Sequence, residues 1–133
     1  MCGIAGILNR HKDHTVDRTL LVRMGEAIAH RGPDDSGEYL NGSVGLAHRR
    51  LSVIDLAGGH QPMINDTNGS AIIYNGELYN FRELHAQYFA DQKFNTSSDT
   101  EVLLRLLNFE SVGWLEELNG MIAFAAWDPA SET

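Results

Sequence analysis

The chain has 133 residues, of which 43% are hydrophobic and 21% charged, and it carries a formal net charge of −8 at pH 7. That length predicts one domain with a single core, and the negative charge argues against binding to nucleic acid or to an anionic membrane. The single cysteine excludes an internal disulfide, and no apolar run approaches the roughly 20 residues of a membrane span. With no signal-peptide pattern, we expect a cytoplasmic protein.

The first half of the chain predicts a strand, a helix and a hairpin. Residues 2–8 are typical of a buried strand, and a polar loop follows them. Apolar side chains then recur once per helical turn and predict an amphipathic helix ending near residue 30: Val16, Leu20, Leu21, Met24 and Ile28. Residues 36–40 and 43–48 predict a hairpin, because the intervening Asn41-Gly42 accepts the positive φ angles of a tight turn.

The middle of the chain predicts a long irregular stretch followed by a second strand. An extended segment is expected at 51–56 and a long loop at 57–69. Residues 70–75 predict an apolar strand that ends at Gly76. Asn80 is then expected to cap a helix, which makes a junction of strand, turn and helix.

The last third predicts a helix, a short turn and a strand. Residues 98–101 match a capping box, so a helix should start there, and a short turn follows at 114–118. Residues 121–127 are apolar on both faces, which is typical of a strand covered on both sides. Strands that cluster, without strict alternation with helices, favour an α+β layered fold.

Cys2 directly follows the initiator methionine, Met1. Removal of Met1, which a small second residue favours, would leave a thiol and a free α-amino group on one residue. In model peptides these groups titrate near ~8.5 and ~7.7–8.0, so both exchange protons close to neutral pH. Position alone leaves two interpretations open: an N-terminal nucleophile with its own base, or a small buried hydrophobic residue.

Several short motifs occur in a recognisable order: CGIAGIL at 2–8, HRGPDDSG at 30–37, LAHRRLSVIDL at 46–56, YNGELYN at 74–80, SSDTEV at 97–102 and NGMIAFAAWD at 119–128. Together they resemble the N-terminal glutaminase domain of class II glutamine amidotransferases. Among these the chain is most similar to glutamine-hydrolysing asparagine synthetase, because of residues 30–34, 50–52 and 59–62.

The resemblance implies an N-terminal nucleophile hydrolase fold, a four-layer αββα sandwich with two antiparallel sheets between helices. Residues 1–133 would form one glutaminase domain that is incomplete at its C-terminal end, because the family continues with further strands before a synthetase domain. An uncovered strand edge would then favour self-association, for example as a homodimer.

The resemblance further implies hydrolysis of the glutamine side-chain amide to glutamate and ammonia. Cys2 would attack the carbonyl and form a thioester, while its α-amino group moves the proton. The side-chain amide of Asn75 and the N–H of Gly76 would form the oxyanion hole, where one donor is typically worth about 2.7–4 kcal/mol. Glycine at 76 would let the backbone approach the substrate and adopt unusual angles. In isolation, Asn75-Gly76 indicates only a turn.

Recognition of glutamine is expected from Arg50, Leu51, Val53, Glu77 and Asp99. Arg50 would hold the α-carboxylate through two hydrogen bonds, and an extended 49–53 would turn Arg49 to the opposite face. Asp99 would pair with the α-ammonium group, unless Ser98 and Asp99 only cap the helix. Glu77 would line the pocket, and Leu51 and Val53 would supply backbone groups and an apolar wall. Without the resemblance, either arginine would be interpreted as a surface residue.

No cofactor or metal is expected in this chain. His11 and His14 are a weak metal signal, and Gly58-Gly59 lacks the lysine of a phosphate-binding loop. ATP and Mg would belong to a synthetase domain outside this sequence, which would use the nitrogen to make asparagine from aspartate. The expected partners are glutamine and that domain. Two alternatives stay open: a non-catalytic glutamine-binding or assembly module, and the glutaminase half of an amidotransferase with another acceptor.

Overall fold

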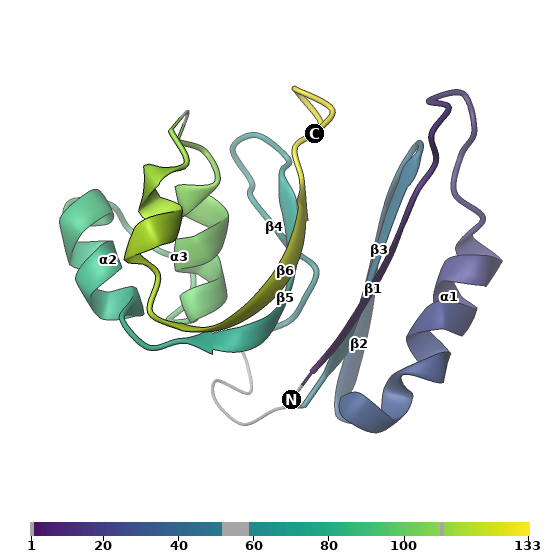
Figure 1. Ribbon diagram of the computed structural model, residues 1–133, viewed down its shortest axis with the longest axis horizontal. Coiled ribbons are helices and arrows are strands. Elements are labelled where there is room, and N and C mark those ends of the chain that lie inside the picture. Colours follow the sequence, from purple (N-terminus) through teal and green to yellow (C-terminus); the bar gives the residue numbers. More distant parts are fainter. Residues whose placement is uncertain (1, 52–58, 110) are drawn as a thin grey trace.

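The computed structural model describes residues 2–51, 59–109 and 111–133. Two sheets stack face to face and helices cover their outer faces, so the layers follow the order helix, sheet, sheet, helix (Figure 1). Both sheets are antiparallel. The expected α+β class and four-layer sandwich are therefore confirmed.

The first sheet has the N-terminal strand at one edge. Its order is β1-β3-β2, with β1 at Gly3–Leu8, β2 at Asp35–Asn41 and β3 at Val44–Arg50. β2 and β3 form the expected hairpin, and Gly42 in its turn has a φ of 54°, which favours glycine. On the outer face lie helix α1, at Arg18–Ala27, and the 3₁₀ turn η1, at Ala29–Arg31 (Figure 1).

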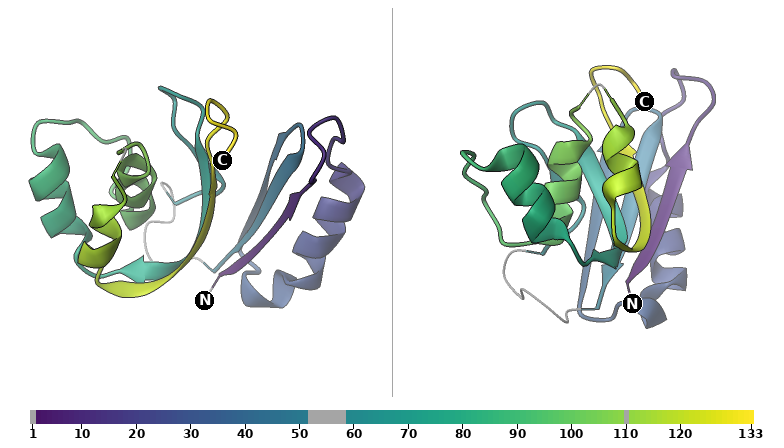
Figure 2. Two further views of the ribbon diagram at one scale, coloured as in Figure 1. Left: turned by 45° about the horizontal axis from the view of Figure 1, so that its top comes forward. Right: turned by 60° about the vertical axis from the view of Figure 1, so that its left-hand side comes forward.

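The second sheet is built around a central strand, β5. Its order is β4-β5-β6, with β4 at Met63–Ile64, β5 at Ala71–Leu78 and β6 at Gly120–Trp127. Helices α2, at Phe81–Phe89, and α3, at Asp99–Leu106, cover the face turned away from the first sheet, together with the 3₁₀ turn η2 at Gly113–Glu117 (Figure 2).

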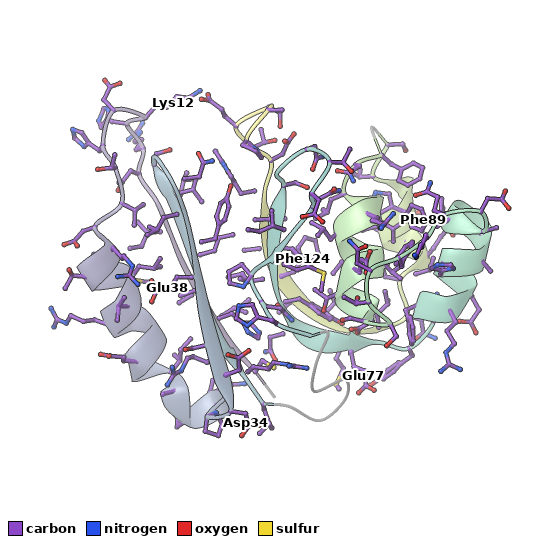
Figure 3. All side chains as sticks on the ribbon, turned by 180° about the vertical axis from the view of Figure 1, so that it is seen from behind. Lys12, Asp34, Glu38, Glu77, Phe89 and Phe124 are labelled. Carbon is purple, nitrogen blue, oxygen red and sulfur yellow. The ribbon has the colours of Figure 1, made fainter. Side chains whose placement is uncertain are left out.

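Apolar side chains pack on both faces of β5. The cluster between the two sheets comprises Val44, Leu46, Ala71, Ile73 and Trp127. The cluster between the second sheet and the helices includes Ile72, Tyr74, Leu84, Leu103 and Leu106. Phe89 and Phe124 belong to this second layer, the one from α2 and the other from β6 (Figure 3). Because both its faces are covered, β5 is the central strand of the core.

Some local expectations for the middle of the chain are wrong. β5 does not end at Gly76, because β6 continues opposite it and the ladder runs to Leu78. The predicted loop 57–69 contains the short strand β4, which pairs with β5. Asn80 precedes α2 but does not cap it. Its side chain instead donates to the Glu117 carbonyl at 2.9 Å and accepts the Asn119 N–H at 3.0 Å.

Two expectations for the last third also need correction. β6 lies at the edge of its sheet, and the expected cover on both sides holds for only part of it: Phe124 and Trp127 pack into the two opposite core clusters, whereas Met121 at its start is 54% exposed. The capping box forms only in part: Ser98 Oγ accepts the Thr100 N–H at 3.2 Å, whereas the Glu101 carboxylate accepts the backbone N–H groups of Asn95 and Thr96.

The predicted extension at 51–56 falls outside the described residues after its first residue. Within the part of the chain that the structure describes, no helix combines the length and the apolar character that crossing a bilayer requires.

Candidate functional site

A cavity of about 400 Å³ opens where the N-terminal end of the chain meets β5 and the start of α3. Small-molecule sites commonly have volumes of roughly 300–1,000 Å³. Its lining includes all but one of the predicted site residues: Cys2, Arg50, Leu51, Asn75, Gly76, Glu77 and Asp99. The remaining one, Val53, lies outside the described residues. Segments far apart in the sequence therefore contribute to one site.

Cys2 reaches the cavity from the residue before β1. The Leu51 N–H donates to its Sγ at 3.5 Å, and the Leu51 carbonyl oxygen lies 3.9 Å from the same sulfur. Arg31 Nε donates to the Cys2 carbonyl at 3.1 Å, so η1 also holds this residue. The start of β1, which follows Cys2, lies at the end of the molecule where the two sheets come together (Figure 1).

The hydrogen-bonding pattern of β5 decides which of its peptide groups face the cavity. The Tyr79 N–H donates to the Asn119 carbonyl at 2.8 Å, so odd-numbered residues of β5 bond to β6 and even-numbered residues face the other edge. At that other edge, β4 pairs only with Ala71 and Ile72. The rest of this edge has no partner strand among the described residues.

Side chains take the place of a partner strand at two positions on this open edge. The Tyr74 N–H donates to Gln61 Oε1 at 2.6 Å, and the Leu78 N–H donates to Asp99 Oδ2 at 2.9 Å. Gly76 lies between them and is exposed. No side chain of the described residues accepts its N–H. This peptide group is therefore available to a molecule in the cavity.

Gly76 is part of a strand, in contrast to the turn that Asn75-Gly76 indicates in isolation. The unusual backbone angles expected of Gly76 are absent, because its φ is not positive. A Cβ at this position would lie 2.0 Å from the Met121 carbonyl oxygen and 2.9 Å from the Tyr74 hydroxyl. The close approach of β6 and of the Tyr74 ring therefore requires glycine here.

Asn75 belongs to the face of β5 that is turned toward the first sheet, which it shares with Ala71 and Ile73 by strand alternation. Cys2 approaches from that sheet. The Asn75 Oδ1 atom is buried and has no hydrogen-bond partner among the described residues. The Asn75 side chain thus has a buried acceptor without a partner and lines the same cavity as Cys2.

Arg50 ends β3, and only 7% of it is exposed. Its neighbour Arg49 is absent from the cavity lining, as alternation along a strand requires. Gly59 makes room for the guanidinium, since a Cβ there would lie 2.2 Å from an Arg50 terminal nitrogen. A guanidinium in this position is suited to bind a carboxylate through two parallel hydrogen bonds.

Ser98 and Asp99 divide the two roles expected of them. Ser98 caps α3, whereas Asp99 lines the cavity and uses one carboxylate oxygen to accept the Leu78 N–H. Glu77 is exposed at the cavity rim, at the end of the molecule that also carries Asp34 (Figure 3). The cavity lining therefore contains the acidic side chains Asp99 and Glu77 together with the basic side chain Arg50.

Tyr74 and Gln61 line the cavity although the sequence predicts no role for either. Tyr74 is 2% exposed; burial and, next, the charge of Asp99 raise the pKa of its hydroxyl, which stays protonated. Gln61 is 6% exposed and bonds to both β5 and α3. Its sequence signal is its place in the motif at 59–62, which supports the resemblance without assigning a function.

His48 is buried between the two sheets. Its Nε2 lies 3.2 Å from the Tyr74 carbonyl and donates to it in the tautomer protonated at that nitrogen. Burial lowers the pKa of His48 to about 4, and the hydrogen bond to Tyr74 offsets this only in part. His48 is therefore neutral near pH 7.

A hydrogen bond lies nearby: His60 Nδ1 is 2.7 Å from Asp35 Oδ2, and this contact lowers the pKa of the Asp35 carboxyl. The described residues give no geometric indication of a metal site. The described residues contain no group of three or more His, Cys, Asp or Glu side chains that could hold a metal ion.

Comparisons with known proteins agree with this geometry. The family model described as a glutamine amidotransferase domain matches residues 1–133. The chain is 39% identical over 130 residues to asparagine synthetase [glutamine-hydrolyzing] 2 of Bacillus subtilis (strain 168), which covers 96% of the chain and 17% of that protein. It is 38% identical over 128 residues to asparagine synthetase B [glutamine-hydrolyzing] of Escherichia coli (strain K12), covering 96% of the chain and 23% of that protein.

A plant relative gives the same result. The chain is 39% identical over 128 residues to asparagine synthetase [glutamine-hydrolyzing] 1 of Arabidopsis thaliana, covering 96% of the chain and 22% of that protein. The chain thus spans between 17% and 23% of the length of these curated relatives.

Proposed function

Because the chain belongs to the family of glutamine amidotransferase domains, we propose that it hydrolyses the side-chain amide of glutamine to glutamate and ammonia. One observation carries this proposal: the Cys2 thiol, the Asn75 amide and the unpaired edge of β5 at Gly76 line one cavity. A nucleophile and two hydrogen-bond donors in one site are what cleavage of an unreactive carboxamide requires.

The proposed nucleophile is the Cys2 thiolate, formed after Met1 is removed. The free α-amino group takes the thiol proton, and the sulfur attacks the side-chain carbonyl carbon of glutamine. When the tetrahedral intermediate collapses, the carbon–nitrogen bond breaks and the amino group returns the proton to the leaving ammonia. Water then hydrolyses the thioester, which releases glutamate and restores the thiol.

The proposed oxyanion hole consists of the Gly76 N–H and the Asn75 side-chain amide. A donor that is already oriented before the reaction stabilises the developing negative charge without reorganisation. The exposure of Gly76 at the open edge supports its part in this proposal. The place of Asn75 in the cavity lining, on the face of β5 turned toward the first sheet, supports the other.

We propose that two side chains of opposite charge bind the two charged groups of free glutamine. Arg50 would bind the α-carboxylate, and the Asp99 oxygen that does not accept the Leu78 N–H would bind the α-ammonium. Glu77, Leu51 and Val53 would line the remainder of the pocket. The low exposure of Arg50 supports this assignment, because a desolvated guanidinium binds carboxylate more strongly than one in water.

The nitrogen acceptor is proposed from the relatives. Each is named as an asparagine synthetase that hydrolyses glutamine. We infer that the released ammonia serves the synthesis of asparagine from aspartate in a longer protein, whose synthetase part would use ATP and Mg. The amidotransferase site would need neither group for the steps described here.

The test combines covalent labelling with product analysis. The protein is treated with a diazoketone analogue of glutamine, and its intact mass is measured with and without excess glutamine. We expect a chain lacking Met1 to take one adduct on Cys2, blocked by glutamine, and to form glutamate. Cys2→Ala and a variant that retains Met1 should form none. Normal turnover by either variant contradicts the proposal, and glutamine binding without turnover favours a non-catalytic module.

A further inference from the structure

The edge of β5 beyond β4 is completed by two side chains that bond to the backbone of one residue, Tyr74. The Tyr74 N–H donates to Gln61 Oε1 at 2.6 Å, and the Tyr74 carbonyl accepts from His48 Nε2 at 3.2 Å. Both groups belong to the edge that lacks a partner strand. In an ordinary ladder a single residue of a neighbouring strand would satisfy both.

We propose that Gln61 is a positioning residue. Its side chain holds Tyr74 and thereby keeps the two donors that follow Tyr74 in the chain directed at the cavity. The inference rests on the proposed function, because those donors are the Asn75 amide and the Gly76 N–H. It assigns to Gln61 no contact with glutamine and no part in proton transfer.

The orientation of the Gln61 amide is itself determined by a second contact. Its Nε2 donates to Thr100 Oγ1 at 3.4 Å, so Oε1 must face the Tyr74 N–H. Gln61 and Thr100 are 6% and 2% exposed, and water therefore competes poorly for these groups. Thr100 is in the first turn of α3, beside Asp99. The contact thus connects the start of α3 to the edge of β5.

A third contact holds the same edge of β5 farther along the strand, at Leu78. Asp99 Oδ2 accepts the Leu78 N–H at 2.9 Å, so the Gly76 peptide is flanked by an anchored residue on each side. β6 pairs with one edge of β5, whereas no neighbouring strand among the described residues fixes this edge beyond β4. Gln61 supplies that constraint on the Tyr74 side, and a displacement of about 1 Å at a reacting centre can reduce the rate 10²-fold.

The kinetic test uses Gln61→Met, which keeps a side chain of similar length and removes both hydrogen bonds. We expect kcat for glutamine hydrolysis to fall about 10- to 100-fold with little change in KM, because donor geometry and not substrate binding is lost. Thr100→Val should lower kcat in the same direction, and Thr100→Ser, which keeps the hydroxyl, should restore it. Gln87→Met, on the exposed side of α2, is the matched control.

A second readout does not depend on activity. Amide hydrogen exchange is followed by NMR at Tyr74 in the wild type and in Gln61→Met. We expect about tenfold faster exchange at Tyr74 in the variant, with unchanged exchange in β1 and β3. Faster exchange throughout the chain would indicate general destabilisation and would contradict a local positioning role.

The two readouts separate this inference from the proposed function. If the wild type forms no glutamate, the proposed function fails, and the exchange at Tyr74 still decides whether Gln61 anchors the strand. If the wild type is active and Gln61→Met has the same kcat, the positioning role is overturned.

Discussion

Arg49 and Arg50 are adjacent, chemically identical and differently placed. Arg50 lines the cavity with its guanidinium against Gly59, whereas Arg49 lies on the other face of β3 and pairs across the sheet with Gly3. Strand alternation is sufficient to separate them. Which of the two faces the cavity depends on the register of β3, and that is a property of the assembled sheet.

Replacement of Arg50 by lysine should therefore affect substrate binding. Lysine keeps the charge but not the planar fork that binds a carboxylate through two hydrogen bonds. We expect Arg50→Lys to raise KM for glutamine about 10- to 100-fold, which corresponds to the loss of one charge-assisted contact. Arg49→Lys is the control, measured in the same assay of glutamate formation. Equal KM values for the two variants would remove Arg50 from the binding site.

His48 should make the stability of the protein depend on pH. Its pKa is about 4 in the folded state, against a reference value of 6.5. Between these values the unfolded chain binds the proton and the folded chain does not, so stability is present above pH 6.5 and is lost as the pH falls toward 4.

The loss between pH 7 and pH 5 should be about 2 kcal/mol from this residue. Urea unfolding at the two pH values measures it. His48→Gln keeps an N–H donor for the Tyr74 carbonyl but does not titrate in this range. Between pH 7 and pH 5 its free energy of unfolding should therefore fall by about 2 kcal/mol less than that of the wild type. An equal pH dependence in the two proteins would show that His48 is protonated as easily in the folded state as in the unfolded chain.

At the scale of elements, α3 illustrates how one helix start can serve both stability and the site. Ser98 Oγ accepts the Thr100 N–H at 3.2 Å, while Asp99 and Thr100 contact β5 and Gln61. Glu101 adds a further connection: although burial opposes its charge, the N–H of Asn95 and the side chain of Arg105 lower the pKa of its carboxyl. The first turn of α3 therefore couples the helix to the cavity wall.

Removal of the cap should destabilise this element without removing a cavity contact of Asp99. We expect Ser98→Ala to lower the free energy of unfolding by about 1 kcal/mol, because one helical N–H loses its acceptor. Ser36→Ala, on the exposed side of β2, should change it by less than about 0.5 kcal/mol. Chemical denaturation of both variants provides the comparison; similar midpoints would show that Ser98 contributes no cap.

At the scale of the whole molecule, the two sheets must remain stacked for the site to exist. Cys2 directly precedes β1 of the first sheet and Arg50 ends its strand β3, whereas Asn75 and Gly76 come from the second sheet. The cluster around Val44, Leu46 and Ile73 packs between the sheets. Burial of apolar surface in this layer, more than any contact in the cavity, sets the distance between nucleophile and donors.

A cavity in that layer should destabilise the entire fold. Ile73 is 1% exposed, and Ile73→Ala should lower the free energy of unfolding by about 2–5 kcal/mol in a single cooperative transition. Ile64→Ala is the control, because Ile64 is 50% exposed at the short strand β4. Urea denaturation followed by fluorescence and circular dichroism measures both. Two separate transitions would mean that the sheets unfold independently.

The sequence alone determines which segments become elements and which chemical groups are available. The hairpin at Asn41-Gly42, the strand after Cys2 and the start of α3 at Ser98 follow from local rules of turn geometry, apolar patterning and capping, which act over a few residues. The motifs likewise predict the family and the residues that now line one cavity, because a motif records side-chain identity in order.

Only the tertiary structure decides how those groups meet. β5 continues through Gly76 because β6 pairs with it, the side chain of Asn80 turns to Glu117 and Asn119, and Gln61 substitutes for a strand that ends early. Each of these depends on a partner between 13 and 46 residues away in the chain, as in Gln61 with Tyr74 and Gly76 with Ile122. Local propensity carries no information about such partners, since contacts between distant segments form only when the layers pack.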